Sequence, residues 1–210
     1  FALIGVGQIN KKNPRIKIFK LLKKLKFSIP KIFSKHAIIS NYATIGEGSV
    51  VMHGAIVGAK VKIGKNCIIN SNSLIEHGSI IGDHSHISTS VTINSGVTIG
   101  ENCFILEDNT IQPYTKIGNN CVLWSGNHLG HHSTVDDHVF ITSHVVIAGM
   151  CHVKKYCWLG INASIRDSTI LEEGSVIGMS ASVSKNTEGN AIYIGIPAKF
   201  FKSCDETIEL

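Results

Sequence analysis

Histidine is the side chain in this sequence best suited to chemistry, and eleven of the 210 residues are histidines. Most of them fall in two clusters, which span residues 76–86 and residues 127–138. The clusters correspond at a spacing of 54 residues, which pairs His77 with His131 and His84 with His138. A neutral imidazole near pH 7 can accept and return a proton. A single exposed histidine often only decorates a surface, so the grouping is what predicts acid–base chemistry here.

A six-residue repeat must position these clusters. Every sixth residue from Ile39 to Val183 is Ile, Val or Leu, and the residue two before each is small, with Asn109 and Asn127 the largest. A hexapeptide period fits neither a helix nor a simple strand and is typical of a parallel β-helix. Three hexads make one triangular coil, and stacking at about 4.8 Å gives about eight coils in a rod roughly 40 Å long. The two clusters, three coils apart, therefore share one angular position.

Five glycines recur every eighteen residues, each directly after an inward apolar residue. This spacing places them on one corner, where we expect them to supply the positive φ of tight turns. They are Gly46, Gly64, Gly82, Gly100 and Gly118.

Five of the six cysteines fall in the small inward column. They are Cys67, Cys103, Cys121, Cys151 and Cys157. This placement predicts buried thiols, without disulfides or zinc, as in a reducing compartment.

The chain has no apolar run near the ~20 residues that a membrane helix needs, and no visible signal peptide. We therefore expect a cytoplasmic protein.

The first 35 residues have a different character, with ten Lys or Arg and no acid. We predict a strand at 1–5, an amphipathic helix at 14–27 and a strand at 29–33. Residues 1–36 then form a partial α/β piece whose first half is absent, before a β-helix at 37–185 and a loop with a helix-like cap at 186–210. The basic helix face is either simply solvated or attracted to an acidic membrane surface or a phosphate-rich substrate.

The hexads, the clusters and the Tyr-x-Gly-x-Pro-Ala-Lys motif at 193–199 together resemble the hexapeptide-repeat acyltransferases. Within these, the chain is most similar to the bacillosamine N-acetyltransferase and sialic-acid O-acetyltransferase group, which acts on sugar nucleotides. The resemblance implies a left-handed β-helix and a homotrimer with acyl-CoA between two rods. Residues 1–5, 13–27 and 38–39 resemble the last βαβ piece of that group's nucleotide-binding domain.

The resemblance offers two positions for the general base. Aligned on residues 70–77, the base is His77 and His86 touches acyl-CoA, but the carboxylate that follows the base in the family is here Gly78. Counted back from residues 148–149 and 157–162, the base is His131, with His132 at the carboxylate position. Phe140 then stands at the CoA histidine. We favour His131 because this register leaves the right length of rod for CoA. Residues 106–113 and 124–132 also resemble a subgroup with longer rods.

The resemblance also implies further site residues. The supporting residues are His128, His132, Asp136 and Asp137; the acyl-CoA contacts are His86, Gly149, Ile161 and Met179; the nucleotide-sugar contact is Gly5.

The implied reaction is transfer of an acetyl or short acyl group from acyl-CoA to an amino group of a nucleotide-linked deoxysugar. O-acetylation of a sugar hydroxyl is the alternative. Corner N–H groups could stabilise the oxyanion.

We expect neither a metal nor a nucleic-acid partner, and peripheral membrane contact only through the basic helix. A γ-carbonic-anhydrase-like zinc protein is disfavoured because no two histidines are five residues apart. A non-catalytic rod is disfavoured because the exposed columns are mixed.

Overall fold

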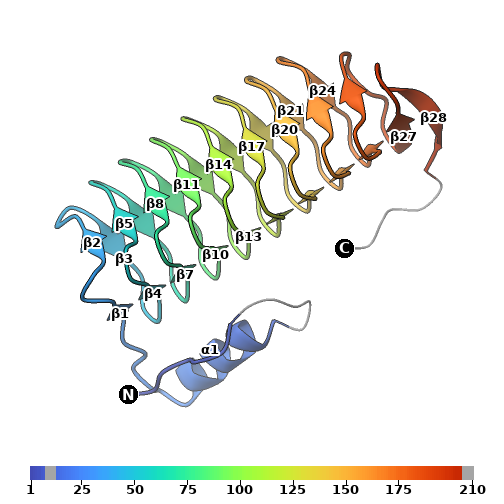
Figure 1. Cartoon of the computed structure of the whole chain (residues 1–210). Helices are drawn as coiled ribbons and strands as arrows, with labels where there is room; N and C mark the ends of the chain where they lie inside the picture. Colours follow the sequence, from blue (N-terminus) through green and yellow to red (C-terminus); the bar gives the residue numbers. More distant parts are fainter. Residues whose placement is uncertain (8–12, 205–210) are drawn as a thin grey trace.

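The chain winds into a rod of three parallel sheets, which Figure 1 shows in the computed structural model. The structure describes residues 1–7 and 13–204. Each coil gives one strand to each sheet, and we call the sheets A, B and C. Neighbouring strands pair eighteen residues apart, as Ile38 of one coil pairs with Ile56 of the next. The predicted β-solenoid is confirmed. Because sheet B has nine strands, the rod has about nine coils instead of eight.

The elements are short and evenly spaced. The helix α1 (Pro14–Lys24) precedes the rod. Sheet A contains β1 (Ile32–Phe33), β4 (Val50–Val51), β7 (Ile68–Ile69), β10 (His86–Ile87), β13 (Phe104–Ile105), β16 (Val122–Leu123), β19 (Phe140–Ile141), β22 (Trp158–Leu159), β25 (Val176–Ile177), β27 (Ala191–Ile194) and β28 (Lys199–Ser203). Sheet B contains β2 (Ile38–Ile39), β5 (Ile56–Val57), β8 (Leu74–Ile75), β11 (Thr92–Ile93), β14 (Thr110–Ile111), β17 (His128–Leu129), β20 (Val146–Ile147), β23 (Ser164–Ile165) and β26 (Ser182–Val183). Sheet C contains β3 (Thr44–Ile45), β6 (Lys62–Ile63), β9 (Ile80–Ile81), β12 (Thr98–Ile99), β15 (Lys116–Ile117), β18 (Thr134–Val135), β21 (His152–Val153) and β24 (Ile170–Leu171).

The branched column forms the core of the rod. Its members from Ile45 to Val183 are all buried, and the most exposed of them, Ile45, retains 7% of its surface. Each strand from β1 to β26 has two residues, so one side chain points inward and the other outward. The outward residue is therefore free to carry polar chemistry without disturbing the core.

The small inward column satisfies backbone groups at the corners. Ser49 Oγ donates to the carbonyl of Gly64 at 2.7 Å and accepts the N–H of Cys67 at 2.9 Å. The thiol of Cys67 repeats the first contact one coil later, with Sγ 3.1 Å from the Gly82 carbonyl. All five column cysteines are buried, as predicted. Burial raises the pKa of Cys67 and of Cys157 to about 12, so these thiols do not act as nucleophiles.

The five repeated glycines lie at corners, but they do not supply the positive φ that was predicted for them. Positive φ falls two residues later in the corner, on Gly48, Asn66 and His84 for example. The repeated glycines instead permit close approach of successive coils. A Cβ at Gly46 would lie 2.5 Å from the carbonyl carbon of Gly64, and no side chain fits at that distance.

The N-terminal segment differs from the predicted α/β piece. The helix ends at Lys24 instead of 27, and the described residues 1–7 contain no strand. β1 begins at Ile32, not at residue 29, and it pairs with β4, so the rod starts before residue 37. Residues 38–39 form β2, which pairs with β5 and therefore belongs to the rod. The physical reason is that the backbone of β1 finds its partner in the next coil.

A buried arginine fixes α1 beside the first coils (Figure 1). Arg15 is 2% exposed, and its guanidinium donates to the carbonyls of Ile4, Val6 and Gly48 at 2.9–3.0 Å. Burial lowers its pKa. The exposed face of α1 carries lysines. Contact of this face with an acidic membrane surface stays a prediction. No helix in the described ranges is long and apolar enough to cross a membrane.

The C-terminal end closes sheet A with a hairpin. β27 continues the parallel ladder beside β25, and β28 pairs antiparallel with β27. The predicted helix-like tail is therefore wrong for residues 199–203, and the rest of it, 205–210, lies outside the described residues. An antiparallel final strand occupies the edge that the last coil would otherwise expose.

Candidate functional site

His131 and His132 lie together on the corner between β17 and β18. Both side chains are exposed, and their Nδ1 atoms are 3.1 Å apart. Their rings meet edge to face, with centroids 5.3 Å apart. A contact between two imidazole nitrogens needs one N–H donor and one lone pair, so the pair fixes opposite tautomers on the two rings. The candidate base is therefore oriented by its own chain neighbour.

Gly149, on the same corner of the next coil, makes room for the His131 ring. A Cβ at this position would lie 2.9 Å from Cε1 and 2.9 Å from Nε2 of His131. No hydrogen bond from the Gly149 N–H is found within the described part of the chain. The His131 ring thus packs against the Gly149 backbone, in space that a side chain at this position would occupy. The structure brings these two predicted site residues together.

The His77 corner, three coils earlier, is built differently. The His77 side chain is 70% exposed, and its Nδ1 is 3.4 Å from Oε2 of Glu76, the residue before it. The residue after it is Gly78, so no second ring orients the imidazole. The position that corresponds to Gly149 is Ser95. His77 therefore has a weak carboxylate contact and few other restraints.

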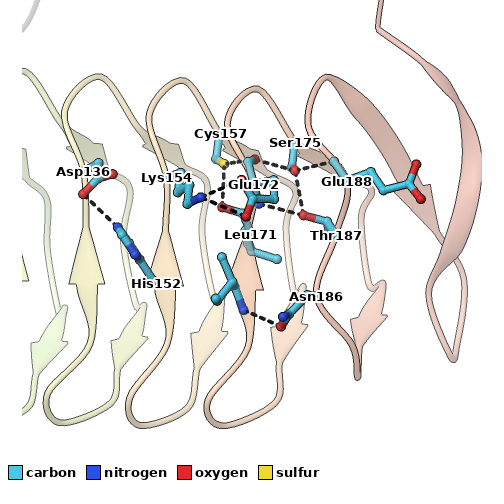
Figure 2. A network of polar contacts seen from close by, with 11 residues as sticks. Asp136, His152, Lys154, Cys157, Leu171, Glu172, Ser175, Asn186, Thr187 and Glu188 are labelled. Carbon is cyan, nitrogen blue, oxygen red and sulfur yellow. Dashed lines mark hydrogen bonds and ion pairs between the residues drawn. The ribbon is translucent and has the colours of Figure 1, made fainter.

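Asp136 and Asp137, predicted to support the base, do not contact His131 within one chain. They follow β18, at the far end of the strand from His131. Oδ1 of Asp136 lies 3.0 Å from Nε2 of His152, as Figure 2 shows, and Oδ1 of Asp137 accepts the N–H of Asn119. His128 points outward from β17 and is half-buried. Of the supporting residues, only His132 touches the candidate base.

The Asp136–His152 pair was missed by the sequence reasoning. The two residues are sixteen apart, which matches neither the hexad nor the coil repeat. The available signal was that His152 occupies the outward position of β21, directly beside Thr134 of β18. The carboxylate of one corner thereby reaches the strand of the following coil.

His86, predicted to touch acyl-CoA, is buried in this structure. It is 8% exposed, and neither ring nitrogen has a partner among the described residues. Burial lowers its pKa. The ring packs near Phe104 on the outer face of sheet A, with centroids 6.3 Å apart. A buried ring on this face offers a ligand no polar edge.

The remaining binding candidates are exposed but separated. Ile161 and Met179 lie on successive coils at the corner between sheets A and B, whereas His131 lies between sheets B and C. Gly5 is exposed in the segment before α1, and a Cβ there would meet nothing within 4 Å. Of the predicted acyl-CoA residues, one chain alone therefore brings Gly149 to His131 but not Ile161 or Met179.

A shallow groove of about 340 Å³ adjoins the His131 corner. Its lining residues are Tyr114, Lys116, His132 and Thr134. The Tyr114 and His132 rings pack at 5.1 Å between centroids and close one side. Among the described residues, this groove included, no three His, Cys, Asp or Glu side chains are grouped to hold a metal ion.

Two family models match the sequence. The model described as bacterial transferase hexapeptide (six repeats) matches residues 42–77, 60–95 and 114–149. The model described as hexapeptide repeat of succinyl-transferase matches residues 155–185. Together, these matches cover more than half of the chain. They include the His77 corner and the His131 corner.

Solved structures share the fold. A UDP-N-acetylglucosamine acyltransferase matches with a TM-score of 0.75 and 18% identity, over 81% of this chain and 73% of that one. LpxA from Acinetobacter baumannii matches with a TM-score of 0.64 and 21% identity, over 81% and 73% of the two chains. UDP-N-acetylglucosamine O-acyltransferase from Moraxella catarrhalis matches with a TM-score of 0.56 and 22% identity, over 83% and 73%. At these identities, the likeness establishes the fold.

Proposed function

This chain belongs to the bacterial transferase hexapeptide family, and from that premise we propose that it transfers an acyl group from acyl-CoA to an amino group of a nucleotide-linked deoxysugar. The observation that carries the proposal is the pairing of His131 with His132 beside Gly149. It places an oriented imidazole against a residue whose backbone N–H has no hydrogen-bond partner among the described residues. The similar structures bear the names of UDP-N-acetylglucosamine acyltransferases, which motivates a nucleotide-linked sugar as the acceptor.

His131 is the proposed general base. When its Nδ1–H donates to Nδ1 of His132, its Nε2 keeps a lone pair that can accept a proton from the attacking group. Protonation leaves that Nδ1–H bond intact, so His132 stabilises the imidazolium in the way that an acceptor behind a catalytic histidine does. This assignment gives His132 the role that the resemblance implies for the carboxylate that follows the base.

The Gly149 N–H is the proposed oxyanion donor. The acceptor nitrogen attacks the thioester carbonyl carbon, and the carbonyl oxygen gains negative charge that a preorganised N–H stabilises. The carbon–sulfur bond then breaks, and the CoA thiolate takes the proton held by His131. A hydroxyl acceptor would follow the same steps but depends more on the base, because an amine loses only an ammonium proton. O-acylation is therefore the second candidate.

The proposed assembly is a homotrimer with acyl-CoA between two rods. The observation that supports it is the separation of Ile161 and Met179 from His131 on one chain. A neighbouring copy could bring its own Ile161–Met179 corner to the His131 corner. Light scattering should then give three times the 22.7 kDa chain mass, and a stable monomer that is active would contradict the shared site.

The test of the activity is a panel of nucleotide-linked amino sugars and their hydroxyl counterparts with acetyl-CoA and longer acyl-CoAs, scored by release of free thiol. We expect turnover with at least one amino sugar. The matched control is His131→Ala with the same panel. Thiol release that is absent throughout, or unchanged in the variant, would overturn the proposal.

A further inference from the structure

The groove beside His132 contains an exposed lysine, Lys116. Lys116 points outward from β15 and is exposed, and no ion pair to it is found in the part of the chain that the structure describes. In contrast, Lys154, two coils on at the next corner, is paired with both carboxylate oxygens of Glu172 at 2.7–2.8 Å, as Figure 2 shows. Lys116 therefore keeps its charge available for a ligand.

The surroundings of Lys116 combine three kinds of contact. The tilted rings of Tyr114 and His132 form one wall of the groove, and the Thr134 hydroxyl lies on the strand directly beside Lys116. Neighbouring strands are about 4.8 Å apart, so the ammonium and the hydroxyl can contact oxygens of one phosphate group. Aromatic rings beside a cation and a hydroxyl suit a nucleoside phosphate.

The next residue in the outward column limits the anion-binding surface. His152 follows Thr134 in sheet C, and its Nε2 is engaged by the Asp136 carboxylate. A carboxylate there would repel a phosphate placed beyond Thr134. The favourable surface is thus confined to the Lys116–Thr134 stretch, which lies toward the N-terminal end of the rod from Gly149.

We propose that the groove lined by Tyr114, Lys116, His132 and Thr134 binds the diphosphate of the nucleotide-linked acceptor. This inference rests on the proposed function, since it places the acceptor on the N-terminal side of His131. The proposed acyl-CoA residues Gly149, Ile161 and Met179 all lie on later coils. With its diphosphate in the groove, the acceptor would therefore approach His131 from the N-terminal side of the rod, and acyl-CoA would approach it from the C-terminal side.

The test compares Lys116→Gln with Lys62→Gln. Lys62 is the matched control, because it is an exposed lysine on the same column, three coils earlier, with Gly78 and Ile80 in place of His132 and Thr134. Binding of uridine diphosphate and of coenzyme A is measured separately by calorimetry on the full chain. This readout does not depend on turnover, so failure of the activity and failure of the groove are distinguishable.

We expect Lys116→Gln to weaken uridine diphosphate binding about tenfold, the usual scale for a charge-assisted hydrogen bond. Coenzyme A binding should stay within about twofold, and Lys116→Arg should retain most of the affinity because it keeps the charge. The difference from wild type should shrink at high salt. Unchanged uridine diphosphate binding in Lys116→Gln overturns the proposal. A selective loss of coenzyme A binding also overturns it, by assigning the groove to the donor.

Discussion

The His77 and His131 corners occupy the same angular position on the rod but have different neighbours. His131 is followed by a second histidine and faces a glycine on the next coil. His77 is followed by Gly78 and faces Ser95, and its own contact is a 3.4 Å approach to Glu76. Of these two corners, only the His131 corner thus has a second ring that fixes the tautomer of the imidazole and a glycine against which the imidazole packs.

The comparison teaches that the repeat supplies positions and the outward residues supply chemistry. Both corners rest on the same buried column, with Ser79 and Ser133 hydrogen-bonded to the carbonyl fifteen residues later. The backbone is therefore equivalent at the two corners. Differences in reactivity must come from the few side chains that the corner presents, and these can be changed without loss of the core.

The largest effect should come from removing the candidate base. We expect His131→Ala to lower kcat by about 10²–10⁴ with little change in CoA affinity, the range typical of losing a general base. His77→Ala should cost less than tenfold, because a solvated imidazole leaves no buried partner. Steady-state kinetics on both variants measures the difference. The reverse ranking would move the site three coils, and small losses in both would mean that neither histidine is the base.

A smaller effect should come from adding a side chain at Gly149. In Gly149→Ala, the new Cβ would lie 2.9 Å from the His131 ring, so the ring must turn away from its present position. We expect kcat to fall about tenfold to a hundredfold, since a misplacement near 1 Å is costly in catalysis.

Ser95→Ala at the equivalent point above His77 is the matched control, and its kcat should be unchanged. Thermal melting checks that both variants fold. Wild-type kcat in a folded Gly149→Ala would mean that catalysis does not depend on the present position of the His131 ring against Gly149.

The smallest effect concerns the stability of the fold. It compares His86 with Phe140, which lies at the equivalent position three coils later. Burial lowers the pKa of His86, with Glu107 opposing and Arg15 adding to the shift. The unfolded chain therefore binds the His86 proton more readily, so the native state loses stability as pH falls below about 6.5.

His86→Phe, which copies the later coil, should show a smaller fall in melting temperature between pH 7.5 and 5.5. For a chain of this size, the melting temperatures of wild type and variant at pH 5.5 should differ by about 2–4 °C for each kcal/mol of unfolding free energy that wild type loses through His86. His77→Gln should behave as wild type. An identical pH dependence in His86→Phe and wild type would contradict the assignment.

The sequence alone determined the coil, because a six-residue period with branched and small residues in fixed columns fits only one way of burying apolar side chains. It predicted the burial of Cys67 and the rest of the small column for the same reason. It also placed His77 and His131 on equivalent corners, since 54 residues are three whole coils.

The tertiary structure decided which groups meet across coils. The approach of Gly149 to His131, the pairing of Asp136 with His152, and the burial of His86 all involve residues sixteen or more positions apart, or the packing of an outward face. The hexad constrains inward side chains only, so outward rotamers and contacts are not encoded in the period. The N-terminal segment was misread for a related reason. Its short apolar runs predict strands, but only stacking on a following coil decides which backbone finds a hydrogen-bonding partner.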